Sequence, residues 1–428
     1  MLKLRLHWQI LIAMGLAVLA GLAVGTDGSV FGVRFVDVFG FVGSLFLNAL
    51  KMLIVPLIVS SIIVGIAGIG SGSGFGRLGG KTIGYYALTS LFAILIGLTL
   101  VNITQPGIVD GEPARDVIGL SADTGAVMER VAGRDASDVV DVFLRMIPTN
   151  VVSAAANGQM LGLIFFSLLF GYFMTRLEER RQIDSLFGFW EGVFAVMMRI
   201  TDAIMKLAPI GVFALVAKIV ATTGLSAFAP LAVFFLTVLA ALAAHMLVVM
   251  PLLLKFVAGV NPWRHFRAMA PALLTAFSTS SSSATLPVTM ECVEKNAGVS
   301  NRTTSFVLPL GATVNMDGTA LYECVAAMFI AQAYGLEMTF ATQFTVVALA
   351  LLTSIGVAGI PAASLVAISV ILAAIGLPAE GIGLILAVDR VLDMCRTTVN
   401  VFSDSCGAVV VGRLEGEKDI LAGKQWES

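Results

Sequence analysis

Up to about residue 257, long apolar segments alternate with short polar ones, and the apolar segments contain almost no ionisable residue. As helices, these segments are long enough to cross the roughly 30 Å hydrocarbon core of a bilayer. They lie near residues 9–25, 40–69, 83–104, 159–175, 186–220 and 227–257. The pattern predicts an all-α polytopic membrane protein.

The pattern changes in the second half of the chain. Segment 262–293 is apolar at both ends with a polar run at 278–283, and segment 340–376 is broken centrally by a Gly-Val-Ala-Gly-Ile-Pro stretch. A long helix follows each, at 303–333 and 380–412. Irregular backbone survives at membrane depth only where protein or a water-filled cavity satisfies it, and paired broken segments mark the substrate site of a transporter. We interpret this half as a duplicated unit, a re-entrant hairpin plus a full span. The apolar flanks argue against the alternative of a flexible serine linker.

The last helix carries polar residues on a single stripe, with spacings of four, three, four and four. At 3.6 residues per turn they share roughly a quarter of the helix circumference. The residues are Asp389, Asp393, Arg396, Asn400 and Asp404. Each ionisable group in a span costs about 2.5–3.5 kcal/mol or more, so we expect the stripe to face an interior cavity and to pair internally, with a ligand or with ions. An amphipathic surface helix is the alternative.

The helix 303–333 contains the interruption Asn315-Met316-Asp317-Gly318. Gly318 and the short polar side chains favour local unwinding, which frees carbonyls to coordinate a hard cation. Asn315 and Asp317 add side-chain oxygens, and Asp404 offers the charge of a second ion site. The alternative is a kink with Asp317 capping an amide, but a kink alone gives no reason to bury a carboxylate.

Composition supports the membrane interpretation and limits the partners. The chain is 58% hydrophobic and 13% charged, whereas soluble domains are about 25% charged. A net charge of −2 without a basic cluster gives no sign of nucleic-acid binding. The four cysteines lack CxxC spacing, so neither zinc nor a disulfide framework is indicated.

The distribution of Lys and Arg predicts that both termini lie in the cytoplasm, with the acidic segment 105–141 on the opposite side and an even number of full crossings. The N-terminus leads directly into a span and is interpreted as a retained first helix, not a signal peptide.

Four stretches carry a resemblance to a known family: Ser280–Pro287 (SSSSATLP), Gly311–Tyr322 (GATVNMDGTALY), Gly356–Pro361 (GVAGIP) and Asp389–Asp404 (DRVLDMCRTTVNVFSD). From about residue 10 to 415, the chain closely resembles the dicarboxylate/amino acid:cation symporter family. That family includes the excitatory amino acid transporters and the archaeal sodium/aspartate symporters. The resemblance implies a homotrimer of protomers with eight transmembrane helices and two re-entrant helical hairpins, built from inverted repeats and working by an elevator motion.

The resemblance also divides the chain into a static scaffold and a mobile transport domain. The parts are 1–80 (scaffold helices 1 and 2), 81–105 (helix 3, transport domain), 106–222 (extracellular loop and scaffold helices 4 and 5), 223–415 (transport domain) and 416–428 (cytoplasmic tail). The transport domain would hold helix 6, hairpin 1 at 262–293, helix 7 at 303–333, hairpin 2 at 340–376 and helix 8 at 380–412.

For the substrate, the resemblance implies that Asp393 pairs with the α-amino group and Arg396 with the side-chain carboxylate. The chemistry agrees, because a guanidinium matches a carboxylate bidentately and the two residues lie three apart on one face. Further contacts are implied from Ser280, Ser281, Ser282, Thr319, Ile360, Pro361, Ala362, Ala363, Ser364, Thr397 and Asn400. Neutral amino acid members lack this arginine, and four-carbon dicarboxylate members lack the acid at Asp393, so having both points to an acidic amino acid.

The resemblance implies three sodium sites. The first is Gly311, Asn315, Asn400 and Asp404. The second is Thr313 with carbonyls of Met316, Ser354, Ile355 and Val357. The third is Tyr86, Thr89, Ser90, Asn315 and Asp317. Taken alone, the Tyr-x-x-Thr-Ser pattern would favour hydroxyl groups bonded to the preceding helical turn.

Glu323 stands inside an apolar helix, where sodium-only archaeal members have glutamine and proton-coupled relatives have glutamate. A carboxyl in a low dielectric can load and release a proton near neutral pH. We therefore hypothesise that Glu323 carries a co-transported proton. The alternative is a protonated structural glutamate bonded to a neighbour.

Two departures from the family pattern matter. Archaeal members have an arginine where this chain has Ser280, and animal transporters have one where it has Met394. Arg390, one turn before Met394, is a candidate substitute, and potassium counter-transport stays open. His245, in the sixth apolar segment, is interpreted as a packed polar residue in preference to a proton relay.

The sequence thus predicts an inner (cytoplasmic) membrane symporter for glutamate or aspartate, driven by Na⁺ with a proton also moved, and without an organic cofactor. Alternatives of the same fold are a proton-driven, a C4-dicarboxylate or a neutral amino acid symporter. An anion channel is a rival of another class. An intramembrane hydrolase using Ser281 or Asp393 is disfavoured because Gly-x-Ser-x-Gly is absent. The sequence does not choose between glutamate and aspartate, since one methylene is worth about 1–3 kcal/mol.

Overall fold

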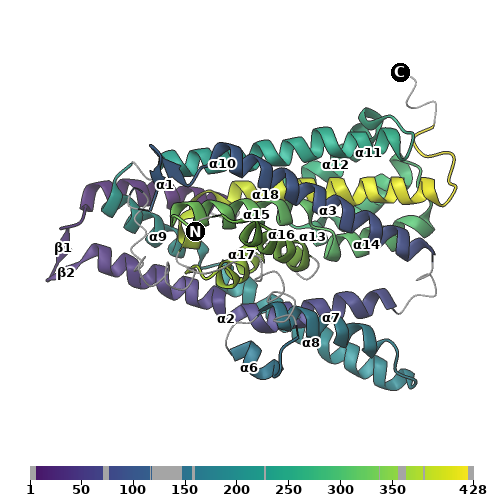
Figure 1. Ribbon diagram of the computed structural model, residues 1–428, viewed down its shortest axis with the longest axis horizontal. Helices are drawn as coiled ribbons and strands as arrows, with labels where there is room; N and C mark the ends of the chain where they lie inside the picture. The colour runs from purple at the N-terminus through teal and green to yellow at the C-terminus, as the bar shows by residue number, and fades with distance from the viewer. Residues whose placement is uncertain are drawn as a thin grey trace.

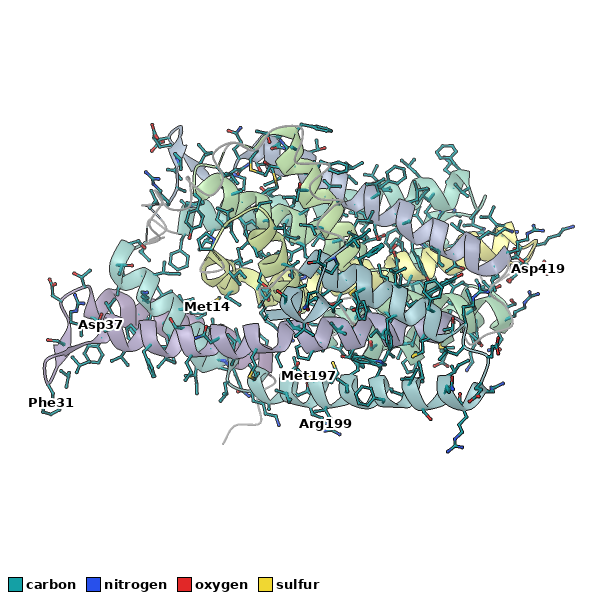
Figure 2. The ribbon with its side chains drawn as sticks, turned by 60° about the horizontal axis from the view of Figure 1, so that its bottom comes forward. Met14, Phe31, Asp37, Met197, Arg199 and Asp419 are labelled. Atoms are coloured by element: carbon teal, nitrogen blue, oxygen red, sulfur yellow. The ribbon has the colours of Figure 1, made fainter. Side chains whose placement is uncertain are left out.

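The computed structural model describes residues 6–70, 77–115, 117, 147–156, 160–225, 228–336, 338–354, 363–378 and 381–422. In these residues the regular structure is helical apart from two short hairpins, which agrees with the predicted all-α class. Strand β1 (Ser29–Val30) pairs antiparallel with β2 (Val33–Arg34), and β3 (Ile108–Val109) with β4 (Glu112–Pro113). Figure 2 shows Phe31, in the first hairpin, and Asp419, near the C-terminus, at opposite ends of the long axis.

One group of helices comes from the first half of the chain. Its members are α1 (Leu6–Val24), α2 (Phe35–Gly70), α6 (Val151–Ala156), α7 (Met160–Met174), α8 (Arg180–Met205) and α9 (Ala208–Thr223). Helices α1 and α2 both pack on α9, and α2 also packs on α7 and α8. Figure 1 shows α2, α7 and α8 along the lower edge of the molecule.

A second group surrounds α18, which runs lengthwise through the middle of the molecule (Figure 1). Its members are α3 (Arg77–Thr104), α10 (Phe228–Ala244), the π-helical turn η1 (His245–Val249), α11 (Met250–Phe256), α12 (Pro262–Thr279), α13 (Ser282–Glu291), the π-helical turn η2 (Cys292–Asn296), α14 (Asn301–Val314), α15 (Asp317–Ala333), α16 (Phe340–Ser354), α17 (Ala363–Ala374) and α18 (Ile382–Leu414). Helix α18 contacts α3, α10, α12, α14 and α15.

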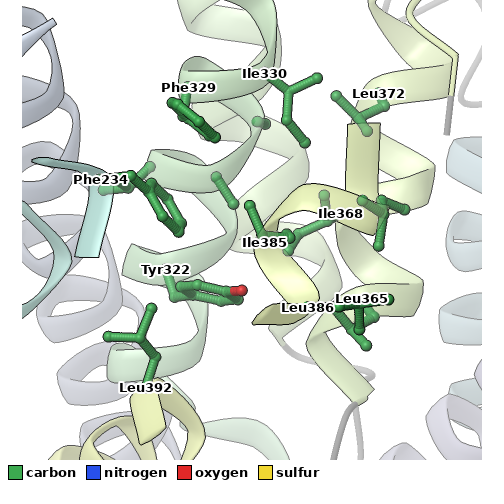
Figure 3. Close-up of a cluster of buried hydrophobic side chains, with 14 of the residues drawn as sticks. Phe234, Tyr322, Phe329, Ile330, Leu365, Ile368, Leu372, Ile385, Leu386 and Leu392 are labelled. Carbon is green, nitrogen blue, oxygen red and sulfur yellow. The ribbon is translucent and has the colours of Figure 1, made fainter. Parts of the chain in front are cut away.

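Helix α15 forms the centre of this second group, because all of its residues are buried. Phe234 of α10 stacks on Phe329 of α15 with 4.7 Å between ring centroids. Figure 3 shows these rings and Tyr322 beside Ile385 and Leu392 of α18. A helix that is apolar on every side must be enclosed by other elements, so its polar N-terminal turn is held at a fixed place in the core.

Two of the breaks predicted in the second half are confirmed. Helices α12 and α13 are separated at Ser280 and Ser281, and α14 and α15 at Asn315 and Met316. Helices α16 and α17 flank residues 355–362, which lie outside the described residues.

In the described part of the chain, two helical stretches, Arg77–Thr104 and Phe228–Phe256, are long and apolar enough to cross a membrane. The segment predicted to span near 186–220 is formed by α8 and α9, which meet at a bend of 53°. Pro209 lies in the first turn of α9 and has no amide hydrogen to continue the hydrogen bonds of α8, which favours a break there. The predicted count of eight spans stays a prediction.

The segment after α18 was predicted as a tail, but its described part is docked on the protein. The Glu417 carboxylate accepts hydrogen bonds from Ser300 N at 2.9 Å, Ser300 Oγ at 2.7 Å and Thr303 Oγ1 at 2.6 Å. The Leu421 amide donates to the carbonyl of Ala297 at 2.9 Å. An acidic side chain at the start of α14 satisfies a free amide and complements the helix dipole.

This contact generates a stability prediction for Glu417→Gln. Partial burial raises the pKa of the Glu417 carboxyl, but hydrogen bonds from Thr303 and Ser300 outweigh this and hold the pKa below its ordinary value of 4.5. A carboxylate whose pKa is lower in the folded protein stabilises it above the unfolded pKa and loses that effect as pH falls. We expect Glu417→Gln to cost about 1 kcal/mol at pH 7, with the difference from the unsubstituted protein shrinking below pH 4.5.

The measurement is the thermal unfolding midpoint in detergent from pH 7 to pH 4. Asp419→Asn is the matched control, because the Asp419 side chain is exposed and should leave the midpoint unchanged. An equal loss in both variants, or an undiminished difference at pH 4, would contradict the capping role.

Candidate functional site

The polar stripe of α18 faces the protein interior, as predicted. Its exposed fractions are Asp389 6%, Asp393 7%, Arg396 1%, Asn400 3% and Asp404 3%. The stripe lies against the junction of α14 and α15, since Asn315 and Thr319 both bond to it.

Arg396 is the most buried charged group of the stripe. Its Nη1 donates to Asp389 Oδ1 at 2.9 Å and its Nη2 to Asp393 Oδ1 at 2.7 Å. The guanidinium carbon lies 4.0 Å from the centroid of the Tyr322 ring. Its Nε has no hydrogen-bond partner among the described residues. These contacts fix the orientation of the guanidinium. Because a guanidinium has five N–H donors, it still has N–H groups left to bind a ligand.

Asp393 has a second basic partner, since Arg390 Nη1 donates to its Oδ2 at 3.2 Å. Asp389, Asp393, Arg390 and Arg396 therefore form a charge-balanced quartet on one helix. Burying ion pairs is tolerable when each charge is paired and hydrogen-bonded. A ligand that separates these pairs must therefore give each charge a new partner.

Asn400 connects α18 to the start of α15. Its Oδ1 accepts from the amides of Gly318 at 2.8 Å and Thr319 at 3.3 Å, and its Nδ2 donates to Thr319 Oγ1 at 3.0 Å. A Cβ at Gly318 would lie 2.7 Å from the carbonyl oxygen of Arg396. Gly318 was expected to unwind the helix, but it lies inside the first turn of α15 and allows the backbones to approach closely. Thr397 is also buried.

The first hairpin places its serines at the break between α12 and α13. Ser280 has φ of 51°, and its buried hydroxyl has no partner among the described residues. Ser281 caps α13 by accepting from the Ala284 amide at 3.2 Å, and Ser282 is buried.

At the second hairpin, Ser364 in the first turn of α17 is 2% exposed, and its hydroxyl has no partner among the described residues. Ala363 begins that helix. The other expected contacts, Ile360, Pro361 and Ala362, lie outside the described residues.

The first predicted ion site is assembled in part around Asp404. Asn315 Nδ2 donates to Asp404 Oδ1 at 2.9 Å. A Cβ at Gly311 would lie 2.5 Å from Asp404 Oδ1 and 2.6 Å from the Tyr86 hydroxyl, so the chain passes very close to both. The Asn400 side chain turns to α15 and away from this group.

The third predicted ion site forms around Asp317. Its Oδ1 accepts from Ser90 Oγ at 2.6 Å and Thr89 Oγ1 at 3.4 Å. Its Oδ2 accepts from Ser403 Oγ at 2.5 Å and lies 3.0 Å from His245 Nε2. Thus α3, α15, α18 and the π-turn η1 all converge on one carboxylate.

Asn315 and Tyr86 lie close to the carboxylates of Asp404 and Asp317 in different ways. Asn315 Oδ1 lies 3.5 Å from Thr89 Oγ1, so this residue lies between the two carboxylates. The Tyr86 hydroxyl donates to the Val307 carbonyl at 2.7 Å, which places it beside Gly311 and not in the Asp317 cluster where the resemblance put it.

The second predicted ion site is not assembled in the described residues. The Thr313 hydroxyl donates within its own helix to Leu310 O at 2.9 Å, and the Met316 carbonyl accepts from the Ala320 amide at 2.8 Å. Ser354 ends α16. Ile355 and Val357 lie outside the described residues, so this set stays a prediction.

Glu323 is fully buried one residue after Tyr322. Its Oε2 accepts from Thr353 Oγ1 of α16 at 2.8 Å, whereas its Oε1 has no partner among the described residues. A carboxyl with one neutral donor and no basic partner is costly to hold ionised.

The region around Asp317 and Asp404 differs in charge from the quartet that contains Arg396. Among the described residues, neither Asp317 nor Asp404 forms an ion pair with a lysine or arginine, and no cluster of three His, Cys, Asp or Glu side chains suits a transition metal. Carboxylate, amide and hydroxyl oxygens suit hard cations. The site therefore divides into a charge-balanced quartet on α18 and an anionic, oxygen-rich region around Asp317 and Asp404.

Sequence reasoning missed four groups in this site. They are the role of Asp389, the Tyr322 ring, the Ser403 hydroxyl and the contact of His245 with Asp317. Asp389 was visible in the stripe and Ser403 adjoins Asp404. His245 was judged a packed polar residue, and it is buried, but its partner lies 72 positions away.

Comparison with known proteins matches residues 6–414 to the model of the sodium:dicarboxylate symporter family. The chain is 36% identical to the proton/glutamate-aspartate symporter of Escherichia coli (strain K12), over 98% of this chain and 94% of that protein. It is 34% identical to a proton/sodium-glutamate symport protein of Geobacillus stearothermophilus, over 100% and 98%. It is 38% identical to human excitatory amino acid transporter 3, over 88% and 79%.

The close approach at Gly311 generates a prediction for Gly311→Ala. The added methyl group would lie 2.5 Å from Asp404 Oδ1, so the carboxylate or the helix must shift, at a cost of about 1–3 kcal/mol. We expect a lower unfolding midpoint and a smaller gain in midpoint on adding NaCl in place of choline chloride.

Gly84→Ala in α3 is the matched control, because nothing lies within 4 Å of a Cβ there. Alanine in an open helical position should raise stability by up to about 1 kcal/mol. Equal behaviour of the two variants would contradict the packing of Gly311 against the carboxylate.

Proposed function

Because the chain belongs to the sodium:dicarboxylate symporter family, we propose that it is a secondary active symporter that accumulates L-glutamate or L-aspartate, driven by the sodium gradient with a proton also moved. The names of the relatives above support this substrate class and both coupling ions. The proposed place is a cell's inner membrane, with both termini cytoplasmic.

The observation that carries the proposal is the buried pairing of Asp393 with Arg396. An acidic amino acid has an ammonium group and a side-chain carboxylate. Asp393 would accept hydrogen bonds from the ammonium group, while the remaining N–H groups of Arg396 would bind the side-chain carboxylate as a planar fork. Asp389 and the Tyr322 ring keep the guanidinium in place during this exchange.

The α-carboxylate is proposed to bind at the hairpin tips. The buried hydroxyls of Ser280 and Ser364, which have no partner among the described residues, would donate to it, with backbone groups from Ser280 to Ser282 and from 360–364. Thr319, Thr397 and Asn400 add hydrogen bonds. Buried polar groups are normally paired, so these open hydroxyls support a site that is completed by substrate.

Sodium is proposed to bind at Asp404 and Asp317, two carboxylates that have no lysine or arginine partner in the described part of the chain. Asp404 with Gly311, Asn315 and Asn400 forms one site, and the Asn400 side chain would have to leave α15 to take part. Asp317 with Thr89, Ser90, Asn315 and Tyr86 forms another, and Tyr86 would have to leave Val307 to take part. The third site, at Thr313 with carbonyls of Met316, Ser354, Ile355 and Val357, forms as the second hairpin closes.

The proposed architecture is a homotrimer with an elevator mechanism. The group α1, α2 and α6–α9 would be the static scaffold, and α3 with α10–α18 the mobile unit. The heavier packing within each group than between them supports this division, although α9 also contacts α18 and α2 contacts α14 and α17. It corresponds to eight spans with re-entrant hairpins at α12–α13 and α16–α17.

Arg396→Gln tests the substrate assignment. The amide cannot form the charged bidentate contact, and loss of a buried charge pair costs about 3 kcal/mol, or roughly 100-fold in affinity. We expect sodium-driven uptake of labelled aspartate and glutamate into proteoliposomes to lose about that much apparent affinity, while uptake of serine does not fall in parallel.

Arg390→Gln is the control. In the described part of the chain Arg390 bonds only to Asp393, and its substitution should cost less than about tenfold in affinity. Unchanged aspartate affinity in Arg396→Gln would overturn the assignment. Sodium-dependent currents without accumulation of labelled substrate would favour the rival channel.

Glu323→Gln tests proton coupling. Glutamine keeps the shape and a hydrogen bond to Thr353 but cannot release a proton. We expect uptake by the unsubstituted protein to acidify the vesicle interior, reported by a trapped pH dye. In Glu323→Gln, sodium-dependent aspartate binding should persist while the acidification disappears.

Thr353→Val is the control, because it removes the hydrogen bond to Glu323 and keeps the carboxyl, so acidification should continue. Acidification by Glu323→Gln equal to that of the unsubstituted protein would mean that another group carries the proton.

A further inference from the structure

His245 is a buried imidazole that the proposed transport cycle leaves without a role. It begins the π-turn η1 between α10 and α11. Its Nε2 lies 3.0 Å from Asp317 Oδ2, and both side chains are fully buried. Its Nδ1 has no partner among the described residues. The whole polar function of this residue is thus directed at one carboxylate oxygen.

The donors around Asp317 are of two chemical kinds. Ser90, Thr89 and Ser403 offer hydroxyls, which can rotate and present oxygen lone pairs to a cation. The imidazole nitrogen must hold its hydrogen to contact a carboxylate oxygen, and a ring N–H has no lone pair to offer. When a cation arrives, the hydroxyls are able to become ligands, whereas His245 remains a donor to Asp317.

The two oxygens of Asp317 have different surroundings. Oδ1 faces Ser90 and Thr89 of α3, the side of the proposed sodium site. Oδ2 faces His245 and Ser403. A fixed donor on Oδ2 therefore stops rotation of the carboxylate and keeps Oδ1 directed at the hydroxyls of α3.

The backbone at His245 is itself irregular. The Met250 amide donates to the His245 carbonyl, five residues earlier, as a π-turn requires. Such turns add a residue to the helix and are frequent at functional sites. In α10–α11, the widened turn starts at the residue that reaches Asp317.

We propose that His245 is a positioning residue for sodium coupling. Its Nε2–H orients Asp317 so that Oδ1, with Ser90 and Thr89, is presented to a sodium ion that His245 itself does not touch. This inference rests on the proposed sodium-driven function. Donors that hold a ligating carboxylate are commonly worth 10-fold or more in metal affinity.

The test is the sodium dependence of labelled aspartate uptake by full-length protein in proteoliposomes. His245→Gln places an amide N–H where Nε2 stands, whereas His245→Asn places it one bond short of Asp317. We expect the sodium concentration for half-maximal uptake to rise about tenfold in His245→Asn and to stay within about twofold of the unsubstituted value in His245→Gln. At saturating sodium, the half-saturating aspartate concentration should change little in either variant.

His265→Asn is the matched control. His265 is equally buried, and its Nε2 contacts a hydroxyl, Ser405 Oγ at 2.9 Å, instead of a proposed ligand. The substitution is expected to lower the unfolding midpoint and to leave the sodium requirement unchanged.

The inference is overturned if Asn and Gln at position 245 shift the sodium requirement equally, if neither shifts it, or if His265→Asn shifts it as much. Parallel loss of sodium and aspartate affinity would also overturn it, since it would indicate a general packing role. Failure of the unsubstituted protein to accumulate aspartate with sodium overturns the proposed function and this inference together. A failure seen in the variants alone leaves the proposed function standing.

Discussion

The buried pairing of Arg396 with Asp389 and Asp393 determines which way α18 faces. A guanidinium that is 1% exposed in an apolar helix is tolerable only when its charge is balanced within reach. The helix that carries it must therefore face inward along its whole polar stripe. That orientation brings Asn400 to the start of α15 and Asp404 to the end of α14. The position of Asp404 follows from it, and Ser403 of the same helix reaches Asp317.

The break between α14 and α15 is the second part of the arrangement. Two non-helical residues, Asn315 and Met316, separate the helices. Carbonyls at the end of α14 and amides at the start of α15 are then left without helical partners. Asn400 satisfies the amides, and its side chain is committed to them. The close approach that this requires is possible because Gly311 and Gly318 carry no side chain at the points of contact.

Patterns among neighbouring residues predicted the helix breaks and the buried faces, because these features depend on interactions that are close in the sequence. The 3.6-residue periodicity predicted a single buried stripe on α18, and the runs of small and polar residues predicted where the helices break. The apolar character of 317–333 likewise agrees with a wholly buried α15. These features depend on neighbouring residues, which a single sequence contains in full.

Side-chain direction between distant helices was not predictable in the same way. The Tyr86 hydroxyl bonds to Val307 and His245 bonds to Asp317, across 221 and 72 positions. The partner of each side chain depends on how its helix is rotated about its own axis, and that rotation is set by packing against other helices. The bend between α8 and α9 was missed for a related reason. A run of apolar residues looks continuous across Pro209, although that residue interrupts the hydrogen-bond ladder.

Charge balance explains why the proposed substrate and ions would have to travel together. The quartet of Asp389, Asp393, Arg390 and Arg396 is neutral as a unit, and an acidic amino acid adds one net negative charge to it. Asp317 and Asp404 add two more, and among the described residues neither has a lysine or arginine beside it. Moving this net negative charge through the hydrocarbon core of a membrane costs several kcal/mol for each unpaired charge. Cations bound beside the substrate remove this cost, so cation coupling follows from the same electrostatics that keeps Arg396 in place.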